Sequence, residues 1–293
     1  MACLTGFKPA LFQAVNCLRH YATMMKPKIT AAKLVVKANT LLLLLLGINK
    51  YVFSQSPFSI ILGRPTDTSI TASVMFNQAS QFYIEYGSQP GVYSQTTATY
   101  SAAAEIPDEI DLRNLQANTR YYYRLQYQFI GDPLYTATNE FSFITQRAKE
   151  TTFRFTIEAD EHLYDKKGID NMYKVTLANQ AKDKPDFMLS LGDIFGDDHS
   201  YLDHTYTITA GELDTLHKVY RPFLGELCHS VPFYVALGNH EGERKHHFNY
   251  PIPPPDNLPV NGTLARKKYY PNPYPNTFYS GNTAIEAYGV DKP

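Results

Sequence analysis

Short runs in which apolar and polar residues alternate fill the chain from about residue 57 to residue 147. Turn-forming segments such as Arg64–Asp67 and Ser88–Gly91 separate these runs. A period of two, interrupted by turn residues, predicts the strands of an antiparallel β-sandwich. The clearest runs are Ser59–Leu62, Ser69–Phe76, Gln81–Tyr86 and Tyr122–Tyr127.

A different pattern begins near residue 151 and continues toward residue 293. Segments of helical character, Asp170–Ala181 and Glu212–Leu227, separate the apolar runs. Strands that alternate with helices predict a parallel sheet and an α/β domain. Residues 251–275 are rich in proline and show little periodicity, so we expect an extended loop there. The predicted strands are Thr151–Ile157, Asp186–Leu191 and Pro232–Leu237.

The first 54 residues carry the signature of a secretory signal rather than of a folded domain. The apolar run Leu41–Ile48 follows several lysines and is too short to span a bilayer, and Ser54 offers a small residue for cleavage. A signal of ordinary length would begin at Met24 or Met25, which would make the first 23 residues an upstream extension. A buried helix or a membrane anchor is the alternative. We expect a secreted or periplasmic protein with no stable membrane span after cleavage.

Composition narrows the class of protein. The chain has 293 residues, of which 44% are hydrophobic and 19% charged, as in an ordinary globular protein. Its 27 basic and 28 acidic residues give a net charge of −1, which argues against a nucleic-acid-binding surface. Signal cleavage would remove Cys3 and Cys17 and leave Cys228 alone, so no intrachain disulfide is expected.

The first folded region resembles a fibronectin type III domain. In that fold, a tyrosine at a corner between strands bonds through its hydroxyl to the main chain a few residues upstream. Leu115–Tyr121 precedes a predicted strand in the same way and places Tyr121 at the corner. No cluster of His, Asp or Cys occurs in this region. We therefore expect a spacing or docking role for residues 57–147.

Candidate metal ligands follow each predicted strand of the second region. Asp160 and His162 follow the first strand, Asp193 the second, and Asn239 and His240 the third. Ligands of parallel sheets bind beyond the carboxyl ends of the strands, so these side chains should converge. Carboxylate, amide and imidazole groups suit divalent cations, and a glycine before Asp193 and before Asn239 permits a sharp turn.

The order Asp-x-His, Gly-Asp, Gly-Asn-His-Glu resembles that of the calcineurin-like metallophosphoesterases. The preceding sandwich makes the whole chain similar to a purple-acid-phosphatase-type enzyme. The resemblance implies an αββα four-layer domain over residues 151–293 that holds two divalent ions. It also implies that Asp160 and His162 ligate the first ion, Asp193 bridges both, and Asn239 ligates the second. His240 would act on the phosphoryl group or protonate the leaving group.

Two departures from that family qualify the resemblance. Purple acid phosphatases have Gly at the position of His162 and a metal-binding Tyr at the position of Gly196. A ferric-tyrosinate site is therefore not expected, and the ions would be Zn, Mn or Fe. The family also supplies later histidine ligands, whereas only His246 and His247 follow His240 here. The catalytic domain is accordingly expected to be incomplete at its C-terminus, and this chain to be a fragment of the full enzyme.

The sequence thus predicts an exported, acid-phosphatase-like metallophosphoesterase. It would hydrolyse a small phosphate mono- or diester by attack of a metal-activated water. Two alternatives stay open: a catalytically inert secreted binding module with a phosphatase-like domain, and a phosphodiesterase or nucleotidase. Glu161 and Glu241, which flank the motifs, are expected to be solvated or to support the ligands from behind.

Overall fold

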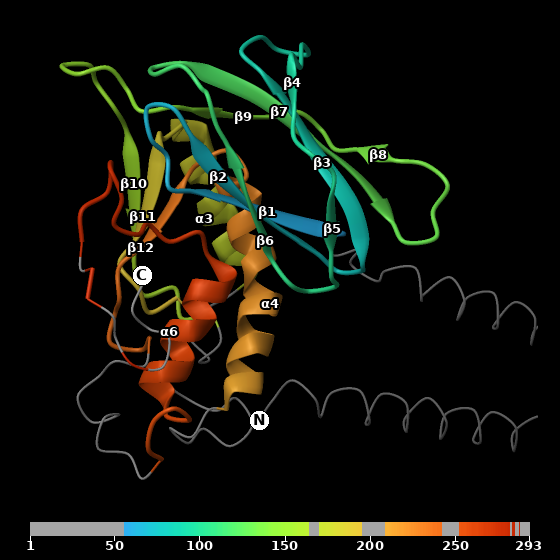
Figure 1. Cartoon of the computed structure of the whole chain (residues 1–293). Helices are drawn as coiled ribbons and strands as arrows, with labels where there is room; N and C mark the ends of the chain where they lie inside the picture. The colour runs from blue at the N-terminus through green and yellow to red at the C-terminus, as the bar shows by residue number, and fades with distance from the viewer. Residues whose placement is uncertain are drawn as a thin grey trace, which may run out of the picture. The chain divides into compact units, whose positions relative to one another are not determined.

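The computed structural model describes residues 56–163, 170–194, 209–241, 252–281, 283–284 and 287. The predicted upstream extension and signal, which together span residues 1–54, lie outside these ranges. Antiparallel sheets come first along the chain, and a parallel sheet with helices follows them (Figure 1). Both parts of the fold class predicted from the sequence, the β-sandwich and the α/β region, are confirmed.

Two antiparallel sheets form the sandwich. The first has the order β1-β2-β6, with β1 at Phe58–Gly63, β2 at Ile70–Phe76 and β6 at Asp108–Leu112. The second is built on the long pair β3–β7, which runs from Ser80↔Phe129 to Gly87↔Tyr122. Its strands are β3 (Ser80–Gly87), β4 (Gln95–Thr96), β5 (Tyr100–Ala102), β7 (Arg120–Phe129), β8 (Thr136–Ala137) and β9 (Phe141–Ile144).

The corner predicted at Tyr121 is present. Tyr121 is buried, and its hydroxyl accepts a hydrogen bond from the main-chain N–H of Gln116 at 2.9 Å. Its ring stacks on Phe143 with centroids 5.7 Å apart. The fibronectin-type corner therefore fixes the start of β7 against the sandwich core.

The α/β part contains a parallel sheet in the order β10-β11-β12. Phe155 pairs with Phe187, and Met188 pairs with Phe233, so the three strands run side by side in one direction. The crossover helices are somewhat longer than the periodicity predicted. The elements are β10 (Phe155–Glu158), α3 (Asp170–Asp183), β11 (Phe187–Ser190), α4 (Ala210–Cys228) and β12 (Phe233–Val235).

The loop expected over residues 251–275 is wrong for its central part, because Leu258–Tyr269 forms helix α6. Asn257 caps this helix by accepting from the N–H of Val260, and Pro259 lies in its first turn, where a missing N–H costs nothing. Proline suggested a loop throughout this segment, but Pro259 lies at the start of a helix. The buried positions are Leu258, Pro259, Val260, Gly262, Arg266 and Tyr269.

Strands β1 and β2 of the first sheet are buried on both faces. Ile60 and Val74 face the sandwich core, whereas the neighbouring Ile61 and Met75 belong to the core of the α/β part. Helix α4 packs on this second face, and its Gly225 lies over β1: a Cβ there would be 3.4 Å from Ser59 Cβ, an ordinary van der Waals distance. The sandwich is thus packed against the α/β region rather than separated from it by a spacer.

A fully buried arginine on helix α4 joins these layers. The Arg221 guanidinium donates to Ser59 Oγ at 3.0 Å, to the Ser73 carbonyl at 2.6 Å and to the Tyr269 carbonyl. It therefore connects β1, β2 and the end of α6. Burial lowers the pKa of Arg221 to about 10, so it stays charged at neutral pH.

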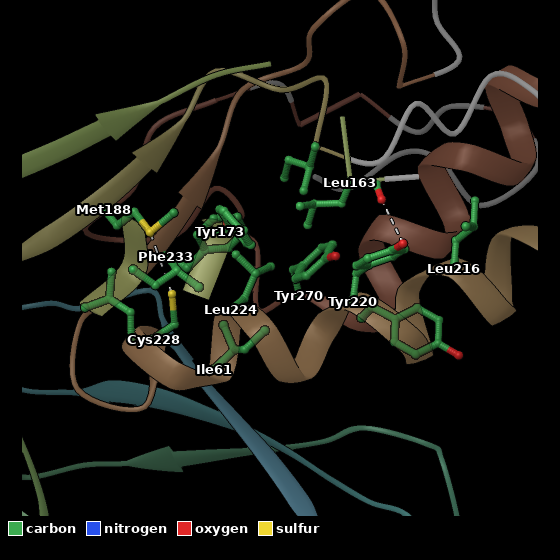
Figure 2. Packing of buried hydrophobic residues seen from close by; sticks show 14 of the residues in the cluster. Ile61, Leu163, Tyr173, Met188, Leu216, Tyr220, Leu224, Cys228, Phe233 and Tyr270 are labelled. Carbon is green, nitrogen blue, oxygen red and sulfur yellow. Dashed lines mark hydrogen bonds between the residues drawn. The ribbon is translucent and has the colours of Figure 1, made fainter. Parts of the chain in front are cut away.

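The core of the α/β part also fixes the first loop at the carboxyl edge of the sheet (Figure 2). Leu163 is buried, and its carbonyl accepts a hydrogen bond from the Tyr220 hydroxyl of α4 at 2.8 Å. On the same helix, Cys228 is buried with its sulfur 3.9 Å from that of Met188 on β11. Helix α4 thus contacts both the sheet and the segment that follows β10.

The other face of the parallel sheet is partly open. Phe155 and Ile157 of β10 are 46% and 54% exposed, and the Phe155 ring stacks on Phe187 with centroids 5.2 Å apart. Parallel sheets are ordinarily covered on both faces. Among the described residues, helices cover only one face. The described residues also include no helix of the length and hydrophobicity that a bilayer span requires.

We predict that Arg221→Ala lowers the free energy of unfolding by about 3 kcal/mol. The substitution leaves a cavity and removes the donor from the buried carbonyls of Ser73 and Tyr269. Urea denaturation followed by circular dichroism measures the effect. Arg113→Ala, at a side chain that is 70% exposed, is the control and should change stability by less than about 0.5 kcal/mol. Equal midpoints for the two variants would contradict the role of Arg221.

A second prediction concerns pH. His217 is buried, stacks on Tyr269 and has Nδ1 2.9 Å from the Tyr270 hydroxyl, and burial lowers its pKa to about 3. In the unfolded chain, where the histidine pKa is about 6.5, His217 therefore binds a proton below pH 6.5, whereas in the folded protein it stays neutral. Stability is full above pH 6.5 and falls by about 1.4 kcal/mol per pH unit below about pH 6 because of this residue.

Urea titrations between pH 6.5 and 4.5 should show a steeper loss of stability for the unmodified protein than for His217→Asn. The asparagine keeps a polar atom near the Tyr270 hydroxyl but takes up no proton. Other groups, such as Asp214, whose hydrogen bonds to Lys218 and Lys268 outweigh its desolvation and hold its pKa near 2, also destabilise the fold in acid and act equally in both proteins. Identical slopes would show that His217 contributes nothing to the pH dependence.

Candidate metal centre

The predicted ligands lie where the three parallel strands end. Asp160 and His162 follow β10, Asp193 follows β11, and Asn239 and His240 follow β12. One ligand atom from each of His162, Asp193 and His240 lies within 4.8 Å of the others. His162 and Asp193 are buried, whereas His240 is half-buried. The parallel register therefore brings together residues that are up to 78 positions apart in the chain.

Asp160 and Asn239 lie at the rim of this cluster. The Asp160 side chain is 71% exposed, with Oδ1 3.6 Å from His162 Nε2. Asn239 is exposed in the loop after β12. The metal-ligand roles assigned to these two residues stay predictions. His246, His247 and Gly196, which entered the comparison with the family's ligand set, lie outside the described residues.

The first two loops are joined by main-chain hydrogen bonds. The N–H groups of Asp160, His162 and Leu163 donate to the carbonyls of Gly192, Asp193 and Ile194 at 3.0–3.2 Å. Asp160, His162 and Asp193 all have a positive backbone φ, which residues other than glycine adopt only rarely. Backbone strain of this kind persists where surrounding contacts enforce it, and it clusters at functional sites.

Two glycines allow the second and third loops to meet. A Cβ on Gly192 would lie 2.1 Å from the Gly238 nitrogen, and one on Gly238 would lie 2.4 Å from Asp193 Oδ1. Gly192 also has a φ of +92°. The glycines that the sequence placed before Asp193 and Asn239 are therefore required by close approach of the two loops as well as by the turn itself.

Side chains cross between these loops in both directions. Asp193 Oδ1 accepts from the His240 N–H at 2.6 Å, and the Glu241 carboxylate accepts from the Asp193 N–H at 2.6 Å. The rings of His162 and His240 meet edge to face, with centroids 5.1 Å apart. The loops thus hold one another independently of any bound ion.

Glutamates form a layer behind the cluster that the sequence indicated only weakly. Glu158 at the end of β10 accepts from the Tyr173 hydroxyl at 2.7 Å and from the Gln180 amide at 2.6 Å. Burial, together with the neighbouring Glu158, raises the pKa of Glu161 to about 9, and burial raises that of Glu241 to about 6. The expectation of a supporting rather than a solvated position fits Glu241, which is 4% exposed.

The donor set is chemically suited to a divalent first-row metal. The imidazole of His162 and the carboxylate of Asp193 match the nitrogen and oxygen ligands of Zn, Mn and Fe, and the imidazole of His240 lies within 4.8 Å of both. The arrangement can also bind an anionic ester, because ions held there would neutralise its charge. The residues present therefore fit the metals that the sequence predicted.

Comparisons with known proteins agree with this geometry. Residues 153–290 match the family model of the calcineurin-like phosphoesterases. No curated protein matches the chain. A solved structure described as that of PhoD aligns with 80% of this chain at 17% identity and a TM-score of 0.52, which shows a shared fold. This chain covers 49% of that structure, or about half its length.

Shorter stretches of this chain also align with other solved structures. One is the sensor domain of the anti-sigma factor RsgI4 of Pseudobacteroides cellulosolvens, at 15% identity, a TM-score of 0.26, 32% of this chain and 80% of that one. Another is the FN1–FN3 domains of chicken CNTN1, at 15% identity, a TM-score of 0.23, 30% of this chain and 31% of that one. With the family match, the parallel sheet and the converging ligands, residues 153–290 are a calcineurin-like phosphoesterase domain, preceded by a β-sandwich that resembles fibronectin domains.

Proposed function

We propose that this protein is an exported, metal-dependent phosphoesterase that hydrolyses small phosphate mono- or diesters. The observation that carries the proposal is the cluster of His162, Asp193 and His240 at the carboxyl edge of the sheet, inside a segment that matches a phosphoesterase family. Export rests on the Leu41–Ile48 segment. An acid-phosphatase-like substrate preference rests only on the sandwich that precedes the catalytic region.

The residues of the site have distinct tasks in this proposal. His162 and Asp193, with Asp160 and Asn239 at the rim, would hold two divalent ions, with Asp193 as a ligand to both. Ions bound there would supply an activated water and neutralise charge on the phosphoryl group. The imidazole of His240 contacts the phosphoryl oxygens or gives a proton to the leaving oxygen. The main-chain bond from the His240 N–H to Asp193 keeps this imidazole beside the shared ligand.

The first test compares Asp193→Ala with His240→Ala in the full chain. Asp193→Ala should lose both metals, because it removes the shared ligand. His240→Ala should keep its metal and lose about 10²–10⁴-fold in turnover, as expected for the loss of a proton donor. Metal content is measured by elemental analysis, and turnover with p-nitrophenyl phosphate and bis(p-nitrophenyl) phosphate, a monoester and a diester.

His229→Asn is the matched control, since its ring lies 4.3 Å from Phe141 of the sandwich. This variant should keep both metal and turnover. Loss of metal in His240→Ala would make His240 a ligand and refute its role on the phosphoryl group. An unmodified protein without metal and without turnover would refute the proposal that this chain is an active phosphoesterase, and would favour a fragment of the full enzyme or the inert binding module.

A further inference from the structure

The Glu241 carboxylate joins the second and third loops of the candidate site. Its Oε1 accepts from the Asp193 N–H at 2.6 Å and from the Ile194 N–H at 3.3 Å, and its Oε2 accepts from the Gly238 N–H at 2.5 Å. Three main-chain donors on two loops therefore share one carboxylate. Hydrogen bonds to an ionised acceptor are roughly twice as strong as neutral ones.

Asp193 in turn binds the third loop. Its Oδ1 accepts a hydrogen bond from the N–H of His240, the residue next to Glu241. The side chain of each loop thus binds the main chain of the other, and we call this arrangement of Asp193 and Glu241 the loop clasp. It fixes one carboxylate oxygen of Asp193, so the direction in which that carboxylate presents its other lone pairs is set before any ion binds.

Helix α6 holds the clasp from the outside. Arg266 donates to the Glu241 carbonyl at 2.6 Å, and a Cβ on Gly262 would lie 2.9 Å from that same oxygen. Glu241 is 4% exposed and lies outside the group of potential ligands. Its carboxylate therefore acts on the site through the loops and not by binding the ion.

The backbone conformation of Asp193 explains why a clasp is needed. Asp193 has a φ of +57°, which a non-glycine residue avoids unless its surroundings enforce it. The bond from its N–H to Glu241 is one such constraint. Without this bond the loop is free to relax toward a more common conformation, and the Asp193 carboxylate would move away from His162 and His240.

We propose that Glu241 is a positioning residue that sets the metal affinity of the site by holding Asp193 in its binding conformation. This inference rests on the proposed function, since it takes Asp193 to be a metal ligand. Partners that orient metal ligands from outside the coordination sphere change affinity by 10–100-fold when they are replaced. The loop clasp is expected to act in that range.

The test titrates the whole chain, free of metal, with Zn²⁺ and, separately, with Mn²⁺. Glu241→Gln nearly keeps the size of the side chain but removes its charge and places an amide N–H against the Gly238 N–H, so that two donors face each other. It should raise the metal dissociation constant 10–100-fold. At saturating metal, kcat for p-nitrophenyl phosphate should fall while KM stays within about twofold, because substrate groups do not contact Glu241 in this proposal.

Asp186→Asn is the matched control. Asp186 directly precedes β11, whereas Asp193 follows this strand. The Asp186 side chain is 10% exposed, and its carboxylate accepts hydrogen bonds from the Arg147 side chain and from the Arg154 N–H at 2.8–3.0 Å. It therefore ties loops together in the same manner but far from the carboxyl edge. This variant should lower the melting temperature of the metal-free protein and leave the metal dissociation constant within about twofold.

Each outcome decides the matter. Glu241→Gln with unchanged metal affinity would overturn the positioning role while leaving the phosphoesterase proposal intact. Equal weakening of metal binding in Glu241→Gln and Asp186→Asn would show a general loss of stability and would also overturn it. If the unmodified protein binds neither ion and hydrolyses nothing, the proposed function fails, and the inference about Glu241 fails with it.

Discussion

The structure depends on the burial of helix α4 between two sheets that belong to different parts of the chain. Arg221 is fully buried at this junction, and its guanidinium binds oxygens of β1, β2 and the end of α6. Taking a guanidinium out of water is costly, so a charge in this position is tolerated only when nearly all its donors are used. The buried arginine therefore favours the one arrangement of helix α4 and sandwich in which its N–H donors are hydrogen-bonded to these oxygens.

The same helix connects that junction to the candidate site. Tyr220, adjacent to Arg221, donates to the Leu163 carbonyl, and Leu163 directly follows His162. Displacement of α4 would therefore move the loop that carries His162. This coupling gives the sandwich a role beyond the spacing or docking expected from its lack of chemical motifs, because its β1-β2-β6 sheet is the surface against which α4 packs.

Within the site, geometry comes from main-chain contacts more than from the ligands themselves. The first loop pairs with the second through three N–H donors, and the second is joined to the third by the loop clasp of Asp193 and Glu241. Gly192 and Gly238 make this approach possible, since a Cβ at either position would collide with the opposite loop. An arrangement enforced in this way can keep three residues in strained conformations before a ligand contributes any binding energy.

The sequence by itself determined the alternation of strands and helices from β10 to β12, the corner at Tyr121 and the positions of the candidate ligands after the three parallel strands. These follow from local patterns: alternation within strands, helical spacing between them, and glycine-containing turns at strand ends. Helix α6 was missed because proline lowered its helical character, although Asn257 before a proline-containing first turn is a helix-start signal.

Only the tertiary structure decided which flanking residues matter. The sequence places both Glu161 and Glu241 next to candidate ligands, yet of these two only Glu241 accepts hydrogen bonds from main-chain donors of a second loop. It also decided that Arg221, an ordinary helix residue in sequence, is fully buried among carbonyl and hydroxyl oxygens. Local sequence patterns predict only the contacts that a residue makes within its own helix, strand or turn. Contacts such as Glu241–Asp193 and Arg221–Ser73 join positions 48 and 148 residues apart, and they exist only once the sheets and helices have packed.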